Sequence, residues 1–267
     1  MIIDSLTHVT PDGRWFNTAY DASEDRLLRE MDAAHVDRAV VVALAEFISN
    51  EFVLEACNRH SERLLPGASF NPAAHRDAAT AAGVFRSELR DSPFCVLKLH
   101  PRLNRYDPLD PRCLALLEEM ASWTTPIPVW LDSLLYCKGV ALRKPIVDTI
   151  HDIVSRFPAL QFVILHSCGT WALHLAEAVR DCPNAMLDFS FTFFRYADTS
   201  MAVDFRHLLH TFDRRMVFGS DFPEISVEAA MRLFRRLAES VSDERCNNVL
   251  GNNLSGLLTA RVPHGAD

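Results

Sequence analysis

Five short apolar segments of the chain each end in a histidine or an aspartate. They are MIIDSLTH, FCVLKLH, PVWLD, FVILH and MVFGSD, which end at His8, His100, Asp132, His166 and Asp221. A buried parallel strand that ends in a titratable residue places that residue at the carboxyl edge of its sheet. If the five strands belong to one closed parallel sheet, these residues meet at one end of the molecule. The pattern therefore predicts an active site on a parallel barrel.

The residue types at these five positions indicate hydrolytic or proton-transfer chemistry. Imidazole and carboxylate groups without thiolates suit a hard or borderline divalent metal. A water on such a metal ionises near neutral pH, and a neighbouring carboxylate takes and returns its proton. Asp221 is placed for either task, as metal ligand or general base. Each residue alone also has a structural explanation, as a core histidine or as an aspartate that caps a turn.

Lys98 and His100 lie two positions apart in VLKLH and therefore share one face of their strand. A lysine that points into a barrel is costly unless it meets a carboxylate or an anionic substrate. In the opposite register Lys98 lies outside and extends between the helices. Periodicity alone leaves both registers open.

The elements that carry these residues alternate regularly between strands and helices. Units of about 30 residues match the size of one strand and its helix. We expect strands at 2–7, 38–44, 64–70, 94–100, 127–132, 161–166, 184–190 and 215–221. Amphipathic helices are expected at 24–35, 50–64, 78–90, 112–123, 145–157, 171–181, 201–212 and 227–241.

Eight such units predict a single-domain (β/α)8 TIM barrel over residues 1–260, with a disordered tail at 261–267. An open doubly wound sheet has the same alternation. However, no GxGxxG follows the first strand, and the length of 267 residues fits the barrel, which typically needs about 250.

The charge and the cysteine pattern of the chain indicate which kinds of partner and which compartment to expect. The net charge is −8 and no basic cluster stands out, which argues against nucleic acid or an anionic membrane as partner. The seven cysteines form no CxxC pair, and the amino terminus has no signal-peptide pattern. We therefore expect a cytoplasmic protein with reduced thiols that acts on a small molecule.

Several of these motifs resemble the amidohydrolase superfamily, in particular its amidohydrolase-2 branch. They are IID with His8, LKLHP at 97–101, ILHSCG at 164–169, FGSDFP at 218–223 and the final segment with Asn253. The resemblance covers nearly the whole chain. It implies a (β/α)8 barrel that hydrolyses amide, ester or lactone bonds, or decarboxylates small aromatic or unsaturated acids.

The chain departs from the pattern of this branch at two positions. The first strand normally carries His-x-His, but Leu6 replaces the first histidine, and Asp132 replaces the histidine that ends the fifth strand. The resemblance then implies one divalent ion, zinc or manganese, held by His8, Asp132, His166 and Asp221. It equally allows no metal, because the branch includes metal-free lactonases that use the eighth-strand aspartate as base.

Our leading hypothesis is a hydrolase of a small carbonyl compound, with a lactone or ester bond favoured over an amide bond. Asp221 is expected to activate water, assisted by His166, Lys98 and His100. Arg102, Arg105 and Phe193 are expected to bind an anionic substrate. The alternatives are a metal-dependent decarboxylase and a barrel that binds a ligand without catalysis.

The aromatic loop FTFFRY at 191–196 either lines the pocket or forms a contact in a homo-oligomer.

Overall fold

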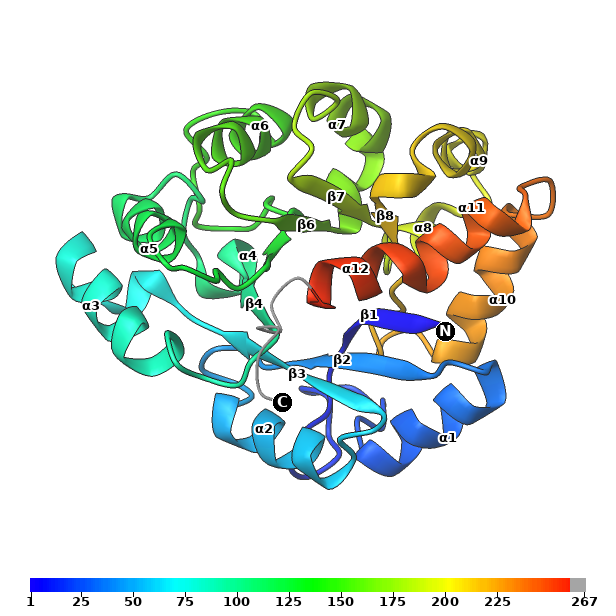
Figure 1. Ribbon diagram of the computed structural model, residues 1–267, viewed down its shortest axis with the longest axis horizontal. Coiled ribbons are helices and arrows are strands. Elements are labelled where there is room, and N and C mark those ends of the chain that lie inside the picture. The colour runs from blue at the N-terminus through cyan, green and yellow to red at the C-terminus, as the bar shows by residue number, and fades with distance from the viewer. Residues whose placement is uncertain (260–267) are drawn as a thin grey trace.

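The computed structural model describes residues 1–259, which form eight parallel strands in the order β1 to β8. Hydrogen bonds from Ser5 N–H to the Phe218 carbonyl and from Asp221 N–H to the Leu6 carbonyl join the two edges of the sheet. The predicted (β/α)8 barrel is therefore confirmed (Figure 1). Its strands are β1 (Ile3–Thr7), β2 (Arg38–Val42), β3 (Leu64–Ser69), β4 (Val96–Leu99), β5 (Val129–Asp132), β6 (Phe162–Leu165), β7 (Ala185–Asp188) and β8 (Met216–Val217).

Helices surround the strands on the outside of the barrel (Figure 1). The α-helices are α1 (Glu24–Ala34), α2 (Asn50–Arg59), α3 (Ala78–Leu89), α4 (Pro101–Asn104), α5 (Pro111–Ala121), α6 (Ile146–Arg156), α7 (Ala172–Ala178), α8 (Thr192–Tyr196), α9 (Met201–Thr211), α10 (Val227–Leu237), α11 (Asp243–Asn247) and α12 (Asn253–Thr259). Short 3-10 segments are η1 (Pro72–Ala74), η2 (His166–Trp171) and η3 (Asp213–Arg215), and η4 (Asn248–Asn252) is a π-helical turn.

Polar side chains start several of the predicted helices. Ser23, Ser49 and Ser226 have extended backbones, and each hydroxyl accepts a hydrogen bond from the backbone amide three residues later. This cap satisfies an amide that has no partner inside the helix. Such caps fix where α1, α2 and α10 begin.

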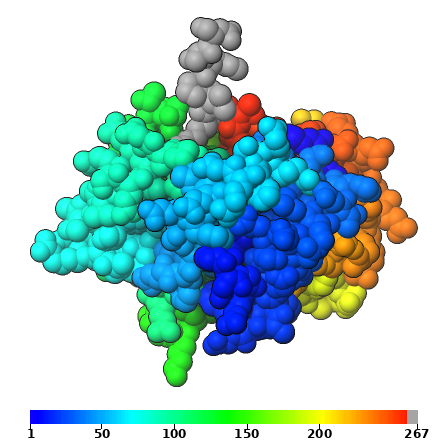
Figure 2. Space-filling view, turned by 90° about the horizontal axis from the view of Figure 1, so that it is seen from below, coloured from blue at the N-terminus to red at the C-terminus, as the bar shows by residue number. Residues whose placement is uncertain are grey.

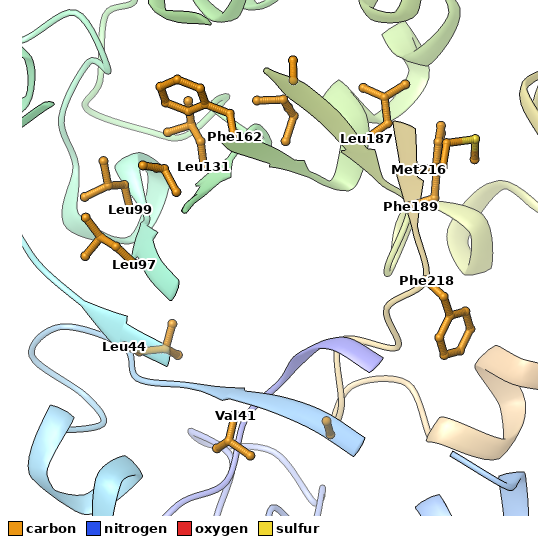
Figure 3. Close-up of a cluster of buried hydrophobic side chains, with 14 of the residues drawn as sticks. Val41, Leu44, Leu97, Leu99, Leu131, Phe162, Leu187, Phe189, Met216 and Phe218 are labelled. Atoms are coloured by element: carbon orange, nitrogen blue, oxygen red, sulfur yellow. The ribbon is translucent and has the colours of Figure 1, made fainter. Parts of the chain in front are cut away.

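The core has two layers, and their separation fixes the register of each strand. Figure 3 shows Leu97 and Leu99 of β4 pointing away from the barrel axis, toward the helices. Residues between them on the strand must then point inward, and Val96 belongs to the apolar cluster inside the barrel. Lys98 therefore faces the interior, which decides between the two registers that the sequence left open. The same inner cluster includes Leu6, Val40, Val42, Trp130, Val163, Leu165 and Val217.

Helix α12 closes the end of the barrel at which the strands begin. Its Leu254 and Leu257 join the inner apolar cluster, and Figure 1 shows the helix lying across this end. Figure 2 shows α12 (red) at one end of the molecule and the segment after β1 (dark blue) displaced toward the other. The carboxyl ends of the strands are thus left to form the site.

The eight predicted helices are present, with ends that differ by a few residues. The segment 191–196 differs more, because it was expected to be a loop but forms the short helix α8. Phe193 of this helix packs against Phe189, which precedes it, and against Phe205 of α9, and these contacts stabilise the turn. The tail predicted for residues 261–267 lies outside the described residues.

Two further findings bear on the expectations from composition. No helix within residues 1–259 is long and apolar enough to cross a membrane. All seven cysteines lie in this part of the chain, and none forms a disulfide.

Gly251 packs against the backbone of Met1, and we expect it to be important for stability. A Cβ at Gly251 would lie 2.0 Å from the backbone oxygen of Met1, so Gly251→Ala should lower the unfolding free energy by about 2 kcal/mol or more. Gly256 of α12 is the matched control, because a Cβ there meets nothing within 4 Å. Gly256→Ala should leave stability unchanged or raise it by up to about 1 kcal/mol. Urea unfolding of both variants tests the pair, and equal stabilities would contradict it.

Candidate active site

All five strand-end residues and Lys98 line one cavity of about 430 Å³. The side chains come from the ends of β1, β4, β5, β6 and β8 and are His8, Lys98, His100, Asp132, His166 and Asp221. Parallel strands in a closed sheet bring their carboxyl ends to the same mouth, so the convergence follows from the topology.

His8 and Lys98 form a hydrogen-bonded pair inside the barrel. The His8 Nδ1 lies 2.7 Å from the carbonyl oxygen of Val42, which can only accept, so Nδ1 carries the proton. The other ring nitrogen, Nε2, is then an acceptor, and Lys98 Nζ donates to it at 3.1 Å. Burial, followed by the positive charge of Lys98, holds the pKa of His8 well below its usual value. His8 is therefore a neutral imidazole that orients the lysine.

Lys98 is 2% exposed and is one of the largest fully buried side chains. Burial lowers its pKa, but the carboxylates of Asp221 and Asp132 oppose this effect and favour the ammonium form. An ammonium group has three N–H donors, and His8 accepts from one of them. Because Lys98 also lines the cavity, its remaining donors are available to a bound molecule.

Asp132 lies between two histidines at the end of β5. Its Oδ2 is 3.2 Å from His166 Nε2 and 3.4 Å from His100 Nδ1, and its Oδ1 accepts from the backbone amide of Leu134. Burial would raise its pKa, but His100, His166 and Lys98 outweigh burial and hold the pKa far below its usual value. Asp132 is therefore a permanent buried anion.

His166 is the positive partner of this anion. Its Nδ1 faces the carbonyl oxygen of Ser190 at 3.0 Å, and its Nε2 faces Asp132, so both ring nitrogens meet acceptors. Burial opposes the charged form, yet the hydrogen bond and charge of Asp132, with Asp221 and Asp188, raise the pKa of His166 to about 9. Both N–H groups of the imidazolium donate to acceptors of the protein, so His166 acts on a ligand through its charge.

The backbone after β6 bends sharply to place His166. His166, Ser167 and Cys168 have φ values of 62°, 45° and 57°, a left-handed conformation that non-glycine residues rarely adopt. The Ser167 hydroxyl donates to the Asp188 carbonyl, and the Cys168 amide donates to the Ser133 hydroxyl. These bonds hold a strained turn that aims the imidazole at Asp132.

Among the strand-end carboxylates, Asp221 is the one that a ligand can reach. Its Oδ1 lies 4.0 Å from His8 Nε2, and its side chain is 15% exposed, against 3% for Asp132. Burial raises its pKa to about 6, while the charges of His166 and Lys98 limit the rise. A carboxylate with this pKa is ionised at neutral pH and is a stronger base than an ordinary aspartate.

His100 remains neutral although it lies near Asp132. Burial lowers its pKa to about 3, and the attraction of Asp132 offsets this only in part. Its Nδ1 makes no well-aligned hydrogen bond. Among the six strand residues, the cations near neutral pH are thus Lys98 and His166, and the anions are Asp132 and Asp221.

The residues expected to bind substrate separate into two groups. Arg102 and Arg105 line the cavity, are exposed, and form no ion pair with any residue in 1–259. Phe193 is placed outside the cavity, where its ring stacks on Phe189 at 4.6 Å. Phe191 lines the cavity instead, because α8 begins at Thr192 and turns residue 193 toward the core.

Sequence reasoning missed Trp15, which covers His8. Its ring stacks on the imidazole with centroids 5.3 Å apart, and its Nε1 donates to Glu224 at 3.1 Å. A single tryptophan in a polar loop carried no signal of this role.

The metal centre considered from the sequence does not fit these residues. No group of three or more His, Cys, Asp or Glu side chains in the described chain is arranged to hold a metal. Lys98 Nζ stands at His8 Nε2, where a metal would bind, and Asp132 Oδ2 faces two histidines. Leu6, in place of a first histidine, belongs to the apolar cluster. An ammonium ion thus occupies the coordination direction of His8.

Solved structures share this fold at low sequence identity. An uncharacterised TIM-barrel protein from Bordetella bronchiseptica has a TM-score of 0.77 and 18% identity, over 97% of this chain and 99% of that one. A probable 2-pyrone-4,6-dicarboxylic acid hydrolase from Acinetobacter baumannii, solved with citric acid, has a TM-score of 0.64 and 16% identity, with coverage of 97% and 99%. A zinc-bound amidohydrolase from Burkholderia multivorans has a TM-score of 0.64 and 17% identity, with the same coverage.

Other structures with this fold are decarboxylases of 5-carboxyvanillate and 2,6-dihydroxybenzoate. No curated protein matches the chain at significant similarity. The family model described as amidohydrolase matches residues 3–253, which is nearly the whole barrel and includes every strand-end residue of the site. The chain therefore belongs to the amidohydrolase family.

Proposed function

We propose that this protein is a metal-independent hydrolase that opens the C–O bond of a small, carboxylate-bearing ester, in particular a lactone. The observation that carries the proposal is the contact of 3.1 Å between Lys98 Nζ and His8 Nε2. It places a fixed cation in the same cavity as the reachable base Asp221. A cation and a base are the two groups that ester hydrolysis needs.

Lys98 is suited to stabilise the oxyanion of the transition state. A charged donor whose side chain is buried, as that of Lys98 is, interacts strongly with the negative charge that develops on a carbonyl oxygen. His8 holds the ammonium group in place, so little reorganisation is needed during the reaction. The imidazolium of His166 adds positive charge to the same cavity without giving up its own hydrogen bonds.

The proposed reaction uses Asp221 twice. Its carboxylate takes a proton from water while the water oxygen bonds to the carbonyl carbon, and the C=O electron pair moves to oxygen beside Lys98. The tetrahedral intermediate then collapses, the C–O bond to the leaving group breaks, and Asp221 returns its proton to the leaving oxygen. The products are a carboxylic acid and an alcohol or enol, and Asp221 is regenerated.

The preference for an anionic substrate rests on Arg102 and Arg105, two cavity arginines whose charges no acidic residue in 1–259 pairs. Guanidinium groups bind carboxylates through paired hydrogen bonds. The pyrone hydrolase of the same fold, solved with citric acid, supports this class of substrate. The decarboxylases of this fold make loss of carbon dioxide the competing reaction.

A panel of carboxylated lactones in H2¹⁸O tests the proposal. The protein, dialysed against EDTA and checked for residual metal, should hydrolyse at least one of them and place one ¹⁸O in the product acid. Added zinc or manganese should not raise the rate. Turnover that requires zinc or manganese would overturn metal independence, and carbon dioxide release without ¹⁸O incorporation would show the competing reaction.

The rate of hydrolysis should have a bell-shaped pH profile. Asp221 must be ionised to accept a proton, so kcat/KM should fall as the pH drops below its pKa of about 6. His166 must be protonated to supply charge, so the rate should fall again as the pH rises past its pKa of about 9. Stopped-time assays from pH 4.5 to 10.5 measure both limbs. A profile flat across pH 6 would exclude Asp221 as the base.

A further inference from the structure

A second cavity of about 420 Å³ adjoins the catalytic one. The two share Arg102, Leu134 and Phe191 among their lining residues, so they meet at these side chains. The two cavities are therefore neighbours, with these three side chains at their common boundary. The second cavity is named here the distal chamber.

The distal chamber is built from segments that follow β4, β5, β6 and β7. Aromatic side chains form much of its wall, namely Tyr136, Trp171, Phe191 and Tyr196. Trp171 and Tyr136 are 50% and 71% exposed although both are large and apolar in part. Exposed aromatic rings around a cavity are a common feature of sites that bind planar ligands.

The charged side chains that line the distal chamber are all positive. Arg102 and Arg195 line it, and no aspartate or glutamate does. Arg195 stands 5.8 Å from the centre of the Phe191 ring, and neither arginine forms an ion pair within residues 1–259. Elsewhere in this part of the chain arginines commonly pair with a nearby carboxylate, as Arg86 does with Glu119. The positive charge of the distal chamber is therefore left for a ligand.

We propose that the distal chamber binds a second carboxylate of the substrate, at Arg195, and that an aromatic or other planar spacer joins this group to the reacting ester. The proposal rests on the proposed function for the position of the ester. The substrate class becomes an elongated dianion, with one acidic group at Arg102 and Arg105 and the other at Arg195. Arg195 would thereby select substrates by length.

The test uses binding without turnover, so that it does not depend on the proposed reaction. The probes are two aromatic diacids of different length, terephthalate and biphenyl-4,4′-dicarboxylate, and their monoacids, benzoate and biphenyl-4-carboxylate. Isothermal titration calorimetry compares each diacid with its monoacid. In the wild type, at least one diacid should bind about tenfold or more tightly than its monoacid, as expected for one added charge-assisted pair.

Arg195→Gln should bring this ratio of affinities close to one. Arg206→Gln is the matched control, because Arg206 is an exposed arginine of α9 that lines neither cavity, and it should keep the wild-type ratio. Because Arg195 is exposed, its substitution should leave the melting temperature unchanged.

Three results would overturn the inference. They are equal binding of diacid and monoacid by the wild type, a ratio that survives in Arg195→Gln, and no binding of any probe at millimolar concentration. If the ratio behaves as expected but no lactone is hydrolysed, the distal chamber stands and the proposed reaction fails.

Discussion

Asp221→Asn is expected to lower kcat for lactone hydrolysis by a factor of about 10²–10⁴, the usual contribution of a positioned general base. The amide has nearly the same shape as the carboxylate, but it cannot accept the proton of the attacking water. Asp221 is the carboxylate of the central cluster that a substrate can reach, since Asp132 is 2% exposed and lies against two histidines. KM should change little, because we propose that the arginines of the two cavities, and not Asp221, bind the substrate carboxylates.

The fold should survive the substitution. Burial raises the pKa of Asp221, which shows that the folded protein disfavours its charge, and a neutral amide removes that cost. Asp181→Asn, an exposed position outside the cavity, is the matched control and should keep the wild-type rate. Purified variants should be compared by kcat and by melting temperature. An Asp221→Asn protein with the wild-type kcat would assign the base to another residue.

The barrel and the mouth of its site could be predicted from the sequence because they depend on local pattern. Each strand is an apolar run, and the polar residue that ends it must leave the core. His8 and Asp221 come together across 213 positions because the sheet closes between β8 and β1. Closure is a property of the topology, so a correct fold is enough to place both residues in one cavity.

The pairings inside the cavity could not be predicted, because they depend on register and on side-chain reach. Periodicity allowed Lys98 to face either way, and only the apolar outward face of β4 decided it (Figure 3). The place of Phe193 could not be predicted for a similar reason. The expected loop at 191–196 forms the helix α8, and Phe191 lines the cavity in place of Phe193. The stacking of Trp15 on His8 depends on the conformation of the loop after β1, which no sequence pattern indicated.

The sequence also could not decide whether the site holds a metal ion, because that depends on where the side chain of Lys98 points. Leu6 and Asp132 each weakened the expected ligand set, but neither indicated what replaces the ion. The group at His8 Nε2 in the structure is Lys98, which comes from a different strand and would lie on the outer surface in the other register. A buried cation can give electrostatic support similar to that of a metal ion, and this is the physical basis of the proposed metal independence.

Lys98→Met is the variant that tests whether Lys98 stabilises the oxyanion or only packs inside the barrel. Methionine fills a similar volume without charge or N–H donors, so kcat should fall by a factor of about 10²–10³, as when one oxyanion donor is lost. Stability should not fall in proportion, because removing a buried ammonium group also removes its desolvation cost. Lys98→Arg should not restore the rate, since a planar guanidinium cannot take the position of a compact ammonium beside His8.

The pH profile of Lys98→Met gives the readout that a structural role would not produce. The charge of Lys98 is one of the two effects that hold the pKa of Asp221 near 6, so its loss should move the acid limb to higher pH. The same variant frees His8 Nε2, and calorimetry with zinc shows whether a metal then binds. A variant with a low melting temperature and an unshifted acid limb would make Lys98 a packing residue. A shifted limb with a preserved fold would place its charge at the reacting base.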